Sequence, residues 1–293
     1  METLRPKLVI IACGSYSPIT PMHLRMFEIA KDYFERTGLY EVIGGIISPT
    51  HDDYGKVGLV PAVHRCTMIK LATRSSSWIR LSDWEIQQSQ WSRTRQVLQY
   101  HKNFMNNFIK SPNSHNEADL PEWLPKKLSE CKHGVHLKLL CGADLLESFN
   151  VPNLWKDEDI EEIVGNYGLI VVSRSGSNPE RFIFDSDLLS KLKFNISLIT
   201  NWVPNEISSS VIRRLISRGE SVKYLIDDAV IEYINRNGLF KTANTKTSKL
   251  TILDKINWET EREKNKKQEY NIIRNQKYPQ RSNLCVKLSE MMF

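Results

Sequence analysis

Side chains able to bind phosphate follow a short apolar run near the start of the chain. Residues 7–13 (KLVIIAC) are predicted to form a buried strand, and Gly14 and Ser15 follow it directly. A helix is predicted from Pro21, which puts His23 in its first turn. Glycine lets the backbone approach a ligand closely, and free N–H groups at a helix start attract anions. The segment therefore predicts a phosphate site; the alternative is a strand–turn–helix corner in which His23 only caps the helix.

A second group of phosphate-binding candidates lies near residue 210. Residues 207–214 read ISSSVIRR, and a helix is predicted over 208–217. Serines at a helix start offer hydroxyls and open N–H groups, and an arginine can fork onto phosphate oxygens. Arg213 is the candidate cation. The alternative is an N-cap followed by solvated arginines.

Lysine and tryptophan side chains provide further candidates. Lys56 stands in the glycine-flanked loop YGKVG, where a flexible point charge suits a phosphate, although it can equally be an ordinary exposed lysine. Trp91 and Trp155 offer indole faces for a flat cationic ring, or serve as core aromatics. A helix predicted over 91–109 puts Thr94 one turn after Trp91, on the same face.

The tetrapeptide CGAD at residues 141–144 ends another predicted strand. Gly142 allows close backbone approach, and the Asp144 carboxylate can accept hydrogen bonds from a ribose. The competing interpretation makes Asp144 the N-cap of a helix over 145–149, and the two roles are compatible.

Alternating strands and helices along the chain must position these residues. Strands are predicted at 7–13, 41–48, 78–82, 136–141, 167–173 and 195–200, and helices at 21–36, 61–73, 91–109, 157–164, 208–217 and 227–237. The alternation predicts an α/β, Rossmann-like, doubly wound and mainly parallel sheet with helices on both faces. Ligands of such sheets bind beyond the carboxyl ends of the strands, which is where the candidates occur.

Composition and charge exclude several classes of protein. With 293 residues, 41% hydrophobic and 25% charged, the chain is not wholly disordered, collagenous or a membrane bundle. Residues 241–293 hold 12 Lys/Arg and 6 Asp/Glu, which accounts for the whole net charge of +6. The remainder is balanced, so nucleic acid is not an expected partner.

The expected organisation is one domain at 1–240, with a mobile surface insertion at 111–134, and a basic, partly disordered tail at 241–293. No apolar run approaches the ~20 residues of a spanning helix. The five cysteines form no C-x-x-C pair, which favours a reducing compartment. We therefore expect an intracellular protein of the cytoplasm or nucleus, and KNKK at 264–267 is a weak nuclear-import candidate.

Motifs for several other chemistries are absent from the sequence. It contains no G-x-x-x-x-G-K-[ST], G-x-G-x-x-G, H-E-x-x-H or G-x-S-x-G pattern, and its histidines lack metal-ligand spacing. No resident metal site is therefore expected.

The segment GSYSPITPMH resembles the nucleotidyltransferase signature G-x-F-x-P-x-[HT]-x-x-H, with Tyr16 in place of the usual Phe and Thr20 where many relatives carry His. Over residues 7–240 the chain resembles the eukaryotic nicotinamide mononucleotide adenylyltransferases. Besides the signature region, the resemblance includes GGIISPTHDDYGKVGL, the Trp91-x-x-Thr94 pair, KLLCGADLLESF, VPNLWK, NYGLIVVSR and NEISSSVIRR.

The resemblance implies transfer of AMP from ATP to nicotinamide mononucleotide, and to nicotinic acid mononucleotide, giving NAD or its deamido form and pyrophosphate. Mg²⁺ is implied as the cofactor that accompanies the ATP phosphates. His23 and Arg213 are the implied catalytic residues. The implied ATP-binding residues are Gly14, Ser15, His23, Gly142, Asp144, Arg174, Ser210, Val211, Ile212 and Arg213. The implied mononucleotide-binding residues are Ser15, Tyr16, Lys56, Trp91, Thr94, Leu154, Trp155 and Asn205.

Two alternatives stay open at this point. A related nucleotidyltransferase would keep the fold but use another acceptor or CTP, against which Trp91-x-x-Thr94 and Asn153-Leu154-Trp155 argue. A chaperone-like role, with client proteins as partners, would add to catalysis. Homo-oligomerisation, the preference between the amide and acid substrates, and the role of the tail are left open by the sequence.

Overall fold

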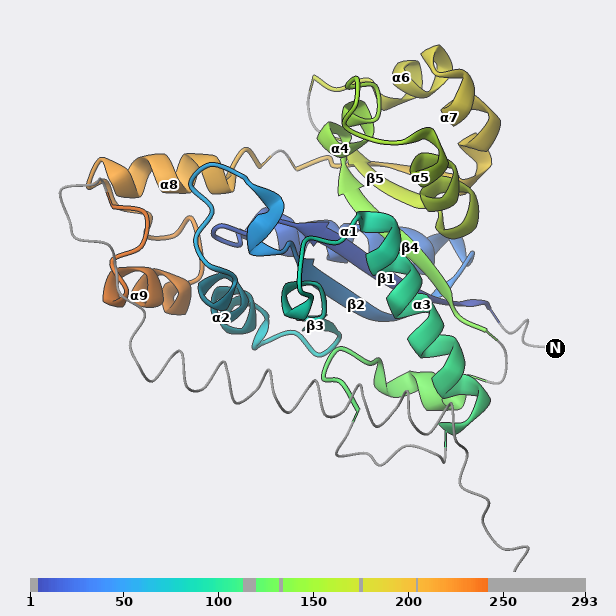
Figure 1. Cartoon of the computed structure of the whole chain (residues 1–293), viewed down its shortest axis with the longest axis horizontal. Helices are drawn as coiled ribbons and strands as arrows, with labels where there is room; N and C mark the ends of the chain where they lie inside the picture. The colour runs from blue at the N-terminus through green and yellow to red at the C-terminus, as the bar shows by residue number, and fades with distance from the viewer. Residues whose placement is uncertain (1–4, 113–119, 132–133, 174–175, 204, 242–293) are drawn as a thin grey trace, which may run out of the picture.

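A parallel β-sheet forms the centre of the computed structural model, which describes residues 5–112, 120–131, 134–173, 176–203 and 205–241 (Figure 1). In spatial order its six strands are β3 (Ile79–Leu81), β2 (Glu41–Pro49), β1 (Lys7–Gly14), β4 (His136–Gly142), β5 (Leu169–Ser173) and β6 (Ile196–Thr200). Every neighbouring pair is parallel. The chain builds outward from β1 in one direction and then in the other, so a crevice opens at the carboxyl ends of β1 and β4.

Helices cover both faces of this sheet. One face carries α1 (Pro21–Thr37), α2 (Ala62–Thr73), α8 (Ser209–Ser217) and α9 (Asp228–Arg236). The other carries α3 (Thr94–Lys110), α4 (Ala143–Ser148), α5 (Asp157–Glu162), α6 (Pro179–Asp185) and α7 (Asp187–Leu192). Because strand side chains alternate, Leu8 and Ile10 join the first core and Val9 and Ile11 the second. The predicted α/β, doubly wound Rossmann-like fold is confirmed.

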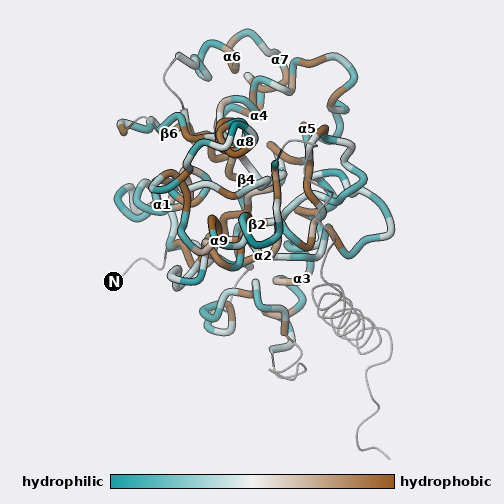
Figure 2. Tube along the Cα trace, turned by 90° about the vertical axis from the view of Figure 1, so that its left-hand side faces the viewer, coloured by the Kyte–Doolittle hydropathy of each residue, from teal (hydrophilic) through white to brown (hydrophobic). Residues whose placement is uncertain are grey.

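Apolar residues concentrate between these layers. Figure 2 shows brown segments gathered around β2 and β4, with teal segments on the outer turns. The strands β1, β2, β4 and β5 are mostly buried, as the near-continuous apolar runs of a two-sided parallel sheet require, whereas the edge strand β6 is only partly buried.

The start of α3 differs from the prediction. The helix begins at Thr94, not at Trp91, because Arg93 has the extended backbone of an N-cap and its N–H donates to the Gln96 side chain at 2.9 Å. Trp91 and Thr94 are therefore not one helical turn apart on one face. The expectation of a shared helix face is wrong.

The segment predicted as a mobile surface insertion differs too, where it is described. Residues 120–131 bury Trp123 and Leu128 in the second core. Gly44 of β2 makes room for them, since a Cβ there would lie 2.4 Å from the Pro125 ring. Residues 113–119 and 132–133, and the tail from 242 with its KNKK cluster, lie outside the described residues.

Two short helices, α6 and α7, were not predicted between β5 and β6, and α5 continues as a wider turn over Ile163–Tyr167. Within the ranges described above, none of the helices has the length and apolar character needed to cross a bilayer.

Candidate active site

The loop after β1 is shaped by a tyrosine that points into the protein. Tyr16 has φ 47°, is buried, and donates its hydroxyl to the Ala12 carbonyl at 2.9 Å. A Cβ at Gly14 would meet the Tyr16 ring at 3.3 Å, so glycine at this position lets the Tyr16 ring pack against the backbone. Because the Tyr16 ring is buried and its hydroxyl already bonded, this residue can offer a ligand only its backbone.

His23 closes a capping box at the start of α1. Its Nδ1 accepts the Thr20 N–H at 3.0 Å and lies 2.8 Å from the Thr20 hydroxyl. Because Nδ1 accepts, the proton of the neutral imidazole is on Nε2, which can only donate. His23 therefore does cap the helix, as the alternative interpretation expected. The same cap fixes the imidazole so that its Nε2–H can donate to an anion.

The start of α8 is tied directly to the same loop. Ser209 donates to the Pro18 carbonyl at 2.8 Å, and Arg213 donates to the Ser17 carbonyl at 2.8 Å and to Ser210 Oγ at 3.2 Å. Partial burial lowers the pKa of the Arg213 guanidinium, which nevertheless keeps its charge. The structure thus brings the two predicted phosphate segments, and with them His23 and Arg213, to one loop.

The neighbouring residues of the α8 segment have structural roles in the helix start. Ile212 is fully buried in the first core, and Val211 is exposed. Ser208 caps the helix by accepting the Val211 N–H at 3.3 Å. Asn205 accepts the Ile207 N–H at 2.9 Å, which fixes the approach to the helix.

Lys56 approaches the loop from another direction. Its Nζ donates to Ser15 Oγ at 3.3 Å. Gly55 and Gly58, with φ 73° and 75°, give the short loop around Lys56 its left-handed turns. An ammonium and a hydroxyl in contact form a suitable pair for a phosphate group.

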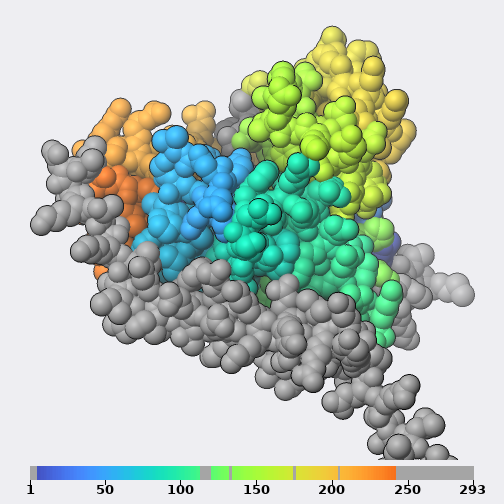
Figure 3. Space-filling view, in the orientation of Figure 1, coloured from blue at the N-terminus to red at the C-terminus, as the bar shows by residue number. Residues whose placement is uncertain are grey.

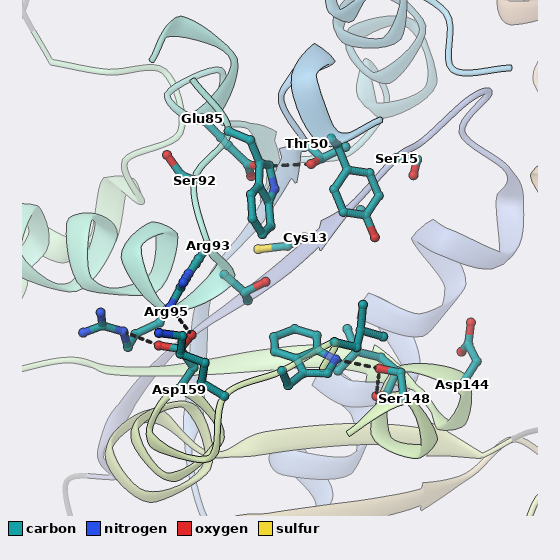
Figure 4. A pocket seen from close by; sticks show the side chains of 18 of the residues that line it. Cys13, Ser15, Thr50, Glu85, Ser92, Arg93, Arg95, Asp144, Ser148 and Asp159 are labelled. Carbon is teal, nitrogen blue, oxygen red and sulfur yellow. Dashed lines mark hydrogen bonds and ion pairs between the residues drawn. The ribbon is translucent and has the colours of Figure 1, made fainter. Parts of the chain in front are cut away.

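A cavity of about 490 Å³ opens beside Ser15 at the carboxyl ends of the strands (Figure 4). Figure 3 shows the blue, teal and yellow-green segments that border it meeting on one face of the molecule. Of the predicted residues, the following line the cavity: Gly14, Ser15, Trp91, Thr94, Asp144, Leu154 and Trp155. The following do not line it: Tyr16, His23, Lys56, Gly142, Asn205, Ser210, Val211, Ile212 and Arg213. Arg174 lies outside the described residues.

Two indole rings line the cavity from two walls: Trp91 from the segment before α3 and Trp155 from the segment before α5. Trp91 is 42% exposed, with the Tyr54 ring 6.0 Å away. Trp155 is fixed by a 3.0 Å hydrogen bond from its indole N–H to Ser148 and by the edge of Phe149 at 5.0 Å. Neither is a fully buried core aromatic, so each can present an indole surface to a flat ligand in the cavity.

Asp144 is not the N-cap of its helix. Gly142 occupies that position, and Asp144 lies in the first turn of α4. A Cβ at Gly142 would come within 2.4 Å of the Asp144 carboxylate, so the glycine allows the carboxylate to face the cavity. The N-cap interpretation of Asp144 is wrong.

An ionic cluster that sequence reasoning missed joins the two walls. Asp159 accepts from Arg93 at 3.0 Å and from Arg95 at 2.7 Å (Figure 4). Arg95 also donates to Glu162 at 2.9 Å. These partners are 64 to 67 residues apart, so no local pattern marks them.

A buried carboxyl at the cavity floor was also missed. Glu85 is 3% exposed and accepts from the Thr50 hydroxyl at 3.1 Å, the His51 N–H at 3.2 Å and the Ser48 hydroxyl at 3.4 Å. Burial raises its pKa from the ordinary 4.5 to about 7, although the three donors act in the opposite direction. Burial, and secondarily Glu85, raises the pKa of the neighbouring Cys13 thiol, which stays protonated and is no nucleophile.

The Glu85 carboxyl predicts how stability depends on pH. The native state holds this proton more tightly than the unfolded chain, so the free energy of unfolding falls as pH rises from about 4.5 to about 7. The loss is at most about 3.5 kcal/mol, from ~1.4 kcal/mol per pKa unit. Glu85→Gln, whose amide can keep the three contacts, should flatten the curve of melting temperature against pH between 5 and 8. Glu232→Gln, on an exposed face, is the control and should leave that curve unchanged. An equally steep slope in Glu85→Gln would contradict the assignment.

Within the described ranges, no group of three or more His, Cys, Asp or Glu side chains is arranged to hold a metal ion. The cavity instead offers single charges, hydroxyls and backbone amides. Such a site can bind two phosphate-bearing molecules and align them, because phosphoryl-type transfer depends on positioning and charge stabilisation.

Comparison with known proteins agrees with this geometry. A cytidylyltransferase-like family model matches residues 11–215. The chain is 62% identical over 243 residues to a nicotinamide-nucleotide adenylyltransferase of Drosophila melanogaster, covering 82% of this chain and 62% of that protein. It is 44% identical over 253 residues to nicotinamide/nicotinic acid mononucleotide adenylyltransferase 1 of Bos taurus, covering 81% and 90%. A Plasmodium falciparum nicotinic acid mononucleotide adenylyltransferase complexed with NaAD superposes with a TM-score of 0.53 at 21% identity, over 80% of this chain and 97% of that one, and supports the fold.

Proposed function

Because the chain belongs to the cytidylyltransferase-like family and, within it, to the nicotinamide/nicotinic acid mononucleotide adenylyltransferases, we propose that it joins AMP from ATP to either mononucleotide. The products are NAD or its deamido form, and pyrophosphate. The observation that carries the proposal is the joining of Arg213 and the His23 loop beside a cavity with two indole walls. We place the activity in residues 1–240.

The reaction needs an aligned nucleophile and a stabilised leaving group. A phosphate oxygen of the mononucleotide attacks the α-phosphorus of ATP, and the bond from that phosphorus to the bridging oxygen of the β-phosphate breaks. Pyrophosphate leaves with the bonding electrons. The attacking phosphate is already an anion, so the chain need not supply a general base. This agrees with a site whose buried thiol and carboxyl are protonated or held by internal hydrogen bonds.

The ATP phosphates lie, in this proposal, between the starts of α1 and α8. The Nε2–H of His23 and the guanidinium of Arg213 donate to the phosphate oxygens and stabilise charge that develops on the leaving pyrophosphate. The N–H groups at both helix starts add their dipoles. Mg²⁺ enters with ATP as part of the substrate, and we assign it no side-chain ligand in the chain.

The mononucleotide occupies the cavity. Ser15 and Lys56 receive its phosphate, and the pyridine ring lies between Trp91 and Trp155. Thr94 and Leu154 flank the ring position from the same two walls. The charged pyridinium of the nicotinamide substrate gains from the indole faces.

A panel of donors and acceptors tests this function. Purified chain is incubated with ATP or CTP and with nicotinamide or nicotinic acid mononucleotide, with Mg²⁺, and the dinucleotide and pyrophosphate are quantified. We expect NAD and its deamido form from ATP, with stoichiometric pyrophosphate. Turnover with CTP and none with either mononucleotide plus ATP would refute the proposal and support a different acceptor.

A further inference from the structure

A fully buried arginine stands behind the proposed mononucleotide phosphate site. Arg65 of α2 has no exposed surface and is the largest side chain in the described residues to be so buried. Taking a guanidinium out of water costs several kcal/mol unless its donors are satisfied. A fully buried cation therefore needs a structural reason.

The hydrogen bonds of Arg65 supply that reason. Its Nε donates to the Val60 carbonyl at 2.9 Å, Nη1 to the Ser15 carbonyl at 3.2 Å, and Nη2 to the Thr50 carbonyl and to Asp52, each at 2.7 Å. Three of these four acceptors are backbone carbonyls, in three separate segments. One guanidinium therefore joins the loop after β1, the turn after β2 and the entry to α2.

These segments carry both members of the predicted phosphate pair. Ser15 is held through its own carbonyl. Lys56 lies in the loop between Asp52 and Val60, and Arg65 binds both ends of that loop. Arg65 thus holds the backbone on both sides of the 3.3 Å contact between Lys56 Nζ and Ser15 Oγ. On one side it binds the Ser15 carbonyl, and on the other it binds the two ends of the loop that carries Lys56.

Apart from a turn hydrogen bond from the Leu59 N–H to the Lys56 carbonyl at 3.1 Å, the loop around Lys56 has little else to fix it. Val57 is 94% exposed, and a Cβ built at Gly58 would meet nothing within 4 Å. Anchors are found at the loop ends instead: Asp52 also accepts the Ala62 N–H at 3.1 Å, and the Val60 N–H donates to Ser17 Oγ at 3.4 Å. The position of Lys56 consequently depends on where its two ends are held.

Glu85 holds the turn after β2 from the opposite side. It accepts from the hydroxyl of Thr50 and the N–H of His51, while Arg65 binds the carbonyl of the same Thr50. The carboxyl and the guanidinium lie close enough for Arg65 to lower the pKa of Glu85, although burial outweighs this effect. The turn is therefore fixed between α2 and the segment that leads to Trp91.

We propose that Arg65 is a positioning residue for the mononucleotide phosphate: it sets the separation of Ser15 and Lys56 without touching the substrate. The inference rests on the proposed function of that pair. Lysine cannot replace Arg65, because its three donors radiate from one nitrogen, whereas the planar guanidinium directs separate N–H groups at Ser15, Thr50 and Val60.

Steady-state kinetics of Arg65→Lys test this role. We expect the KM for nicotinamide mononucleotide to rise about tenfold or more, while the KM for ATP stays within about twofold; tenfold corresponds to ~1.4 kcal/mol. Arg80→Lys is the matched control, because Arg80 also donates to backbone carbonyls, those of Ser76, Ser77 and Ile79, but these lie outside the segments that carry Ser15 and Lys56. It should leave both KM values unchanged.

A double-mutant cycle with Lys56→Ala separates positioning from general destabilisation. If Arg65 acts through Lys56, the effect of Arg65→Lys on the mononucleotide KM shrinks to less than half, on a logarithmic scale, when Lys56 is already absent. Full additivity, or an equal rise in both KM values, would overturn the role. Thermal melts of every variant show whether the fold is kept.

A milder variant keeps the test decisive if Arg65→Lys does not fold. Asp52→Asn removes the charge of the half-exposed partner of Arg65 while its amide oxygen can still accept the Ala62 N–H, and we expect a twofold to fourfold rise in the mononucleotide KM. An unchanged KM in folded Asp52→Asn would then overturn the role.

Equilibrium titration of each variant with nicotinamide mononucleotide alone, followed by tryptophan fluorescence, should show the same loss of affinity in the absence of turnover. Wild-type chain that makes no NAD and binds no mononucleotide would refute the proposed function, whereas active wild type with unaffected Arg65→Lys would refute only the positioning role.

Discussion

Arg213→Ala should lower kcat/KM for ATP about 10²- to 10³-fold with the fold retained, the size expected when a donor aimed at developing charge is removed. The guanidinium is held against the Ser17 carbonyl and the Ser210 hydroxyl, so it is in place before the reaction starts. Partial desolvation strengthens its interaction with an anion. Initial rates at saturating mononucleotide, with thermal melts alongside, measure the effect.

Arg218 provides the control for this prediction. It caps the carboxyl end of the same helix, its side chain is 61% exposed, and it lies 3.9 Å from Glu220. Arg218→Ala should leave the rates within about twofold, because an exposed ion pair contributes little. Equal rates in Arg213→Ala and wild type would remove Arg213 from the mechanism.

His23→Ala should lower kcat about 10²-fold, because the Nε2–H that we assign to the ATP phosphates is lost. The same change removes a helix cap and should reduce the free energy of unfolding by ~1 kcal/mol. Turnover measured well below the melting temperature isolates the chemical effect.

Thr20→Ala separates the two roles of His23. It removes the hydroxyl 2.8 Å from Nδ1, but the Thr20 backbone N–H that orients the imidazole remains. We expect a stability loss of the same order, ~1 kcal/mol, with kcat within about threefold of wild type. A drop in kcat as large as that of His23→Ala would mean that His23 acts only as a cap.

The fold followed from local patterns because parallel strands buried on both faces leave a clear sequence mark. The apolar runs of β1 and β4, each ending at a glycine, predicted where the strands stop and hence where the ligand crevice opens. The two phosphate segments could be recognised because helix starts use a small set of residue types.

What stayed hidden depends on contacts between distant residues. Glu85 and Arg65 are single charged residues in sequence, and only the folded chain brings them to the Thr50 turn. Asp159 meets Arg93 and Arg95 across more than 60 residues. The start of α3 was misplaced because Arg93, not a residue type usual at that position, serves as the N-cap.

The bonds from Ser209 to Pro18 and from Arg213 to Ser17 join residues 191 and 196 positions apart. During synthesis, the first of these loops leaves the ribosome long before its partner helix has been translated. A nascent chain in which α8 has not yet been translated therefore lacks the contacts that tie this helix to the loop after β1. The two helix starts that we propose as the ATP phosphate site can therefore come together only late in synthesis.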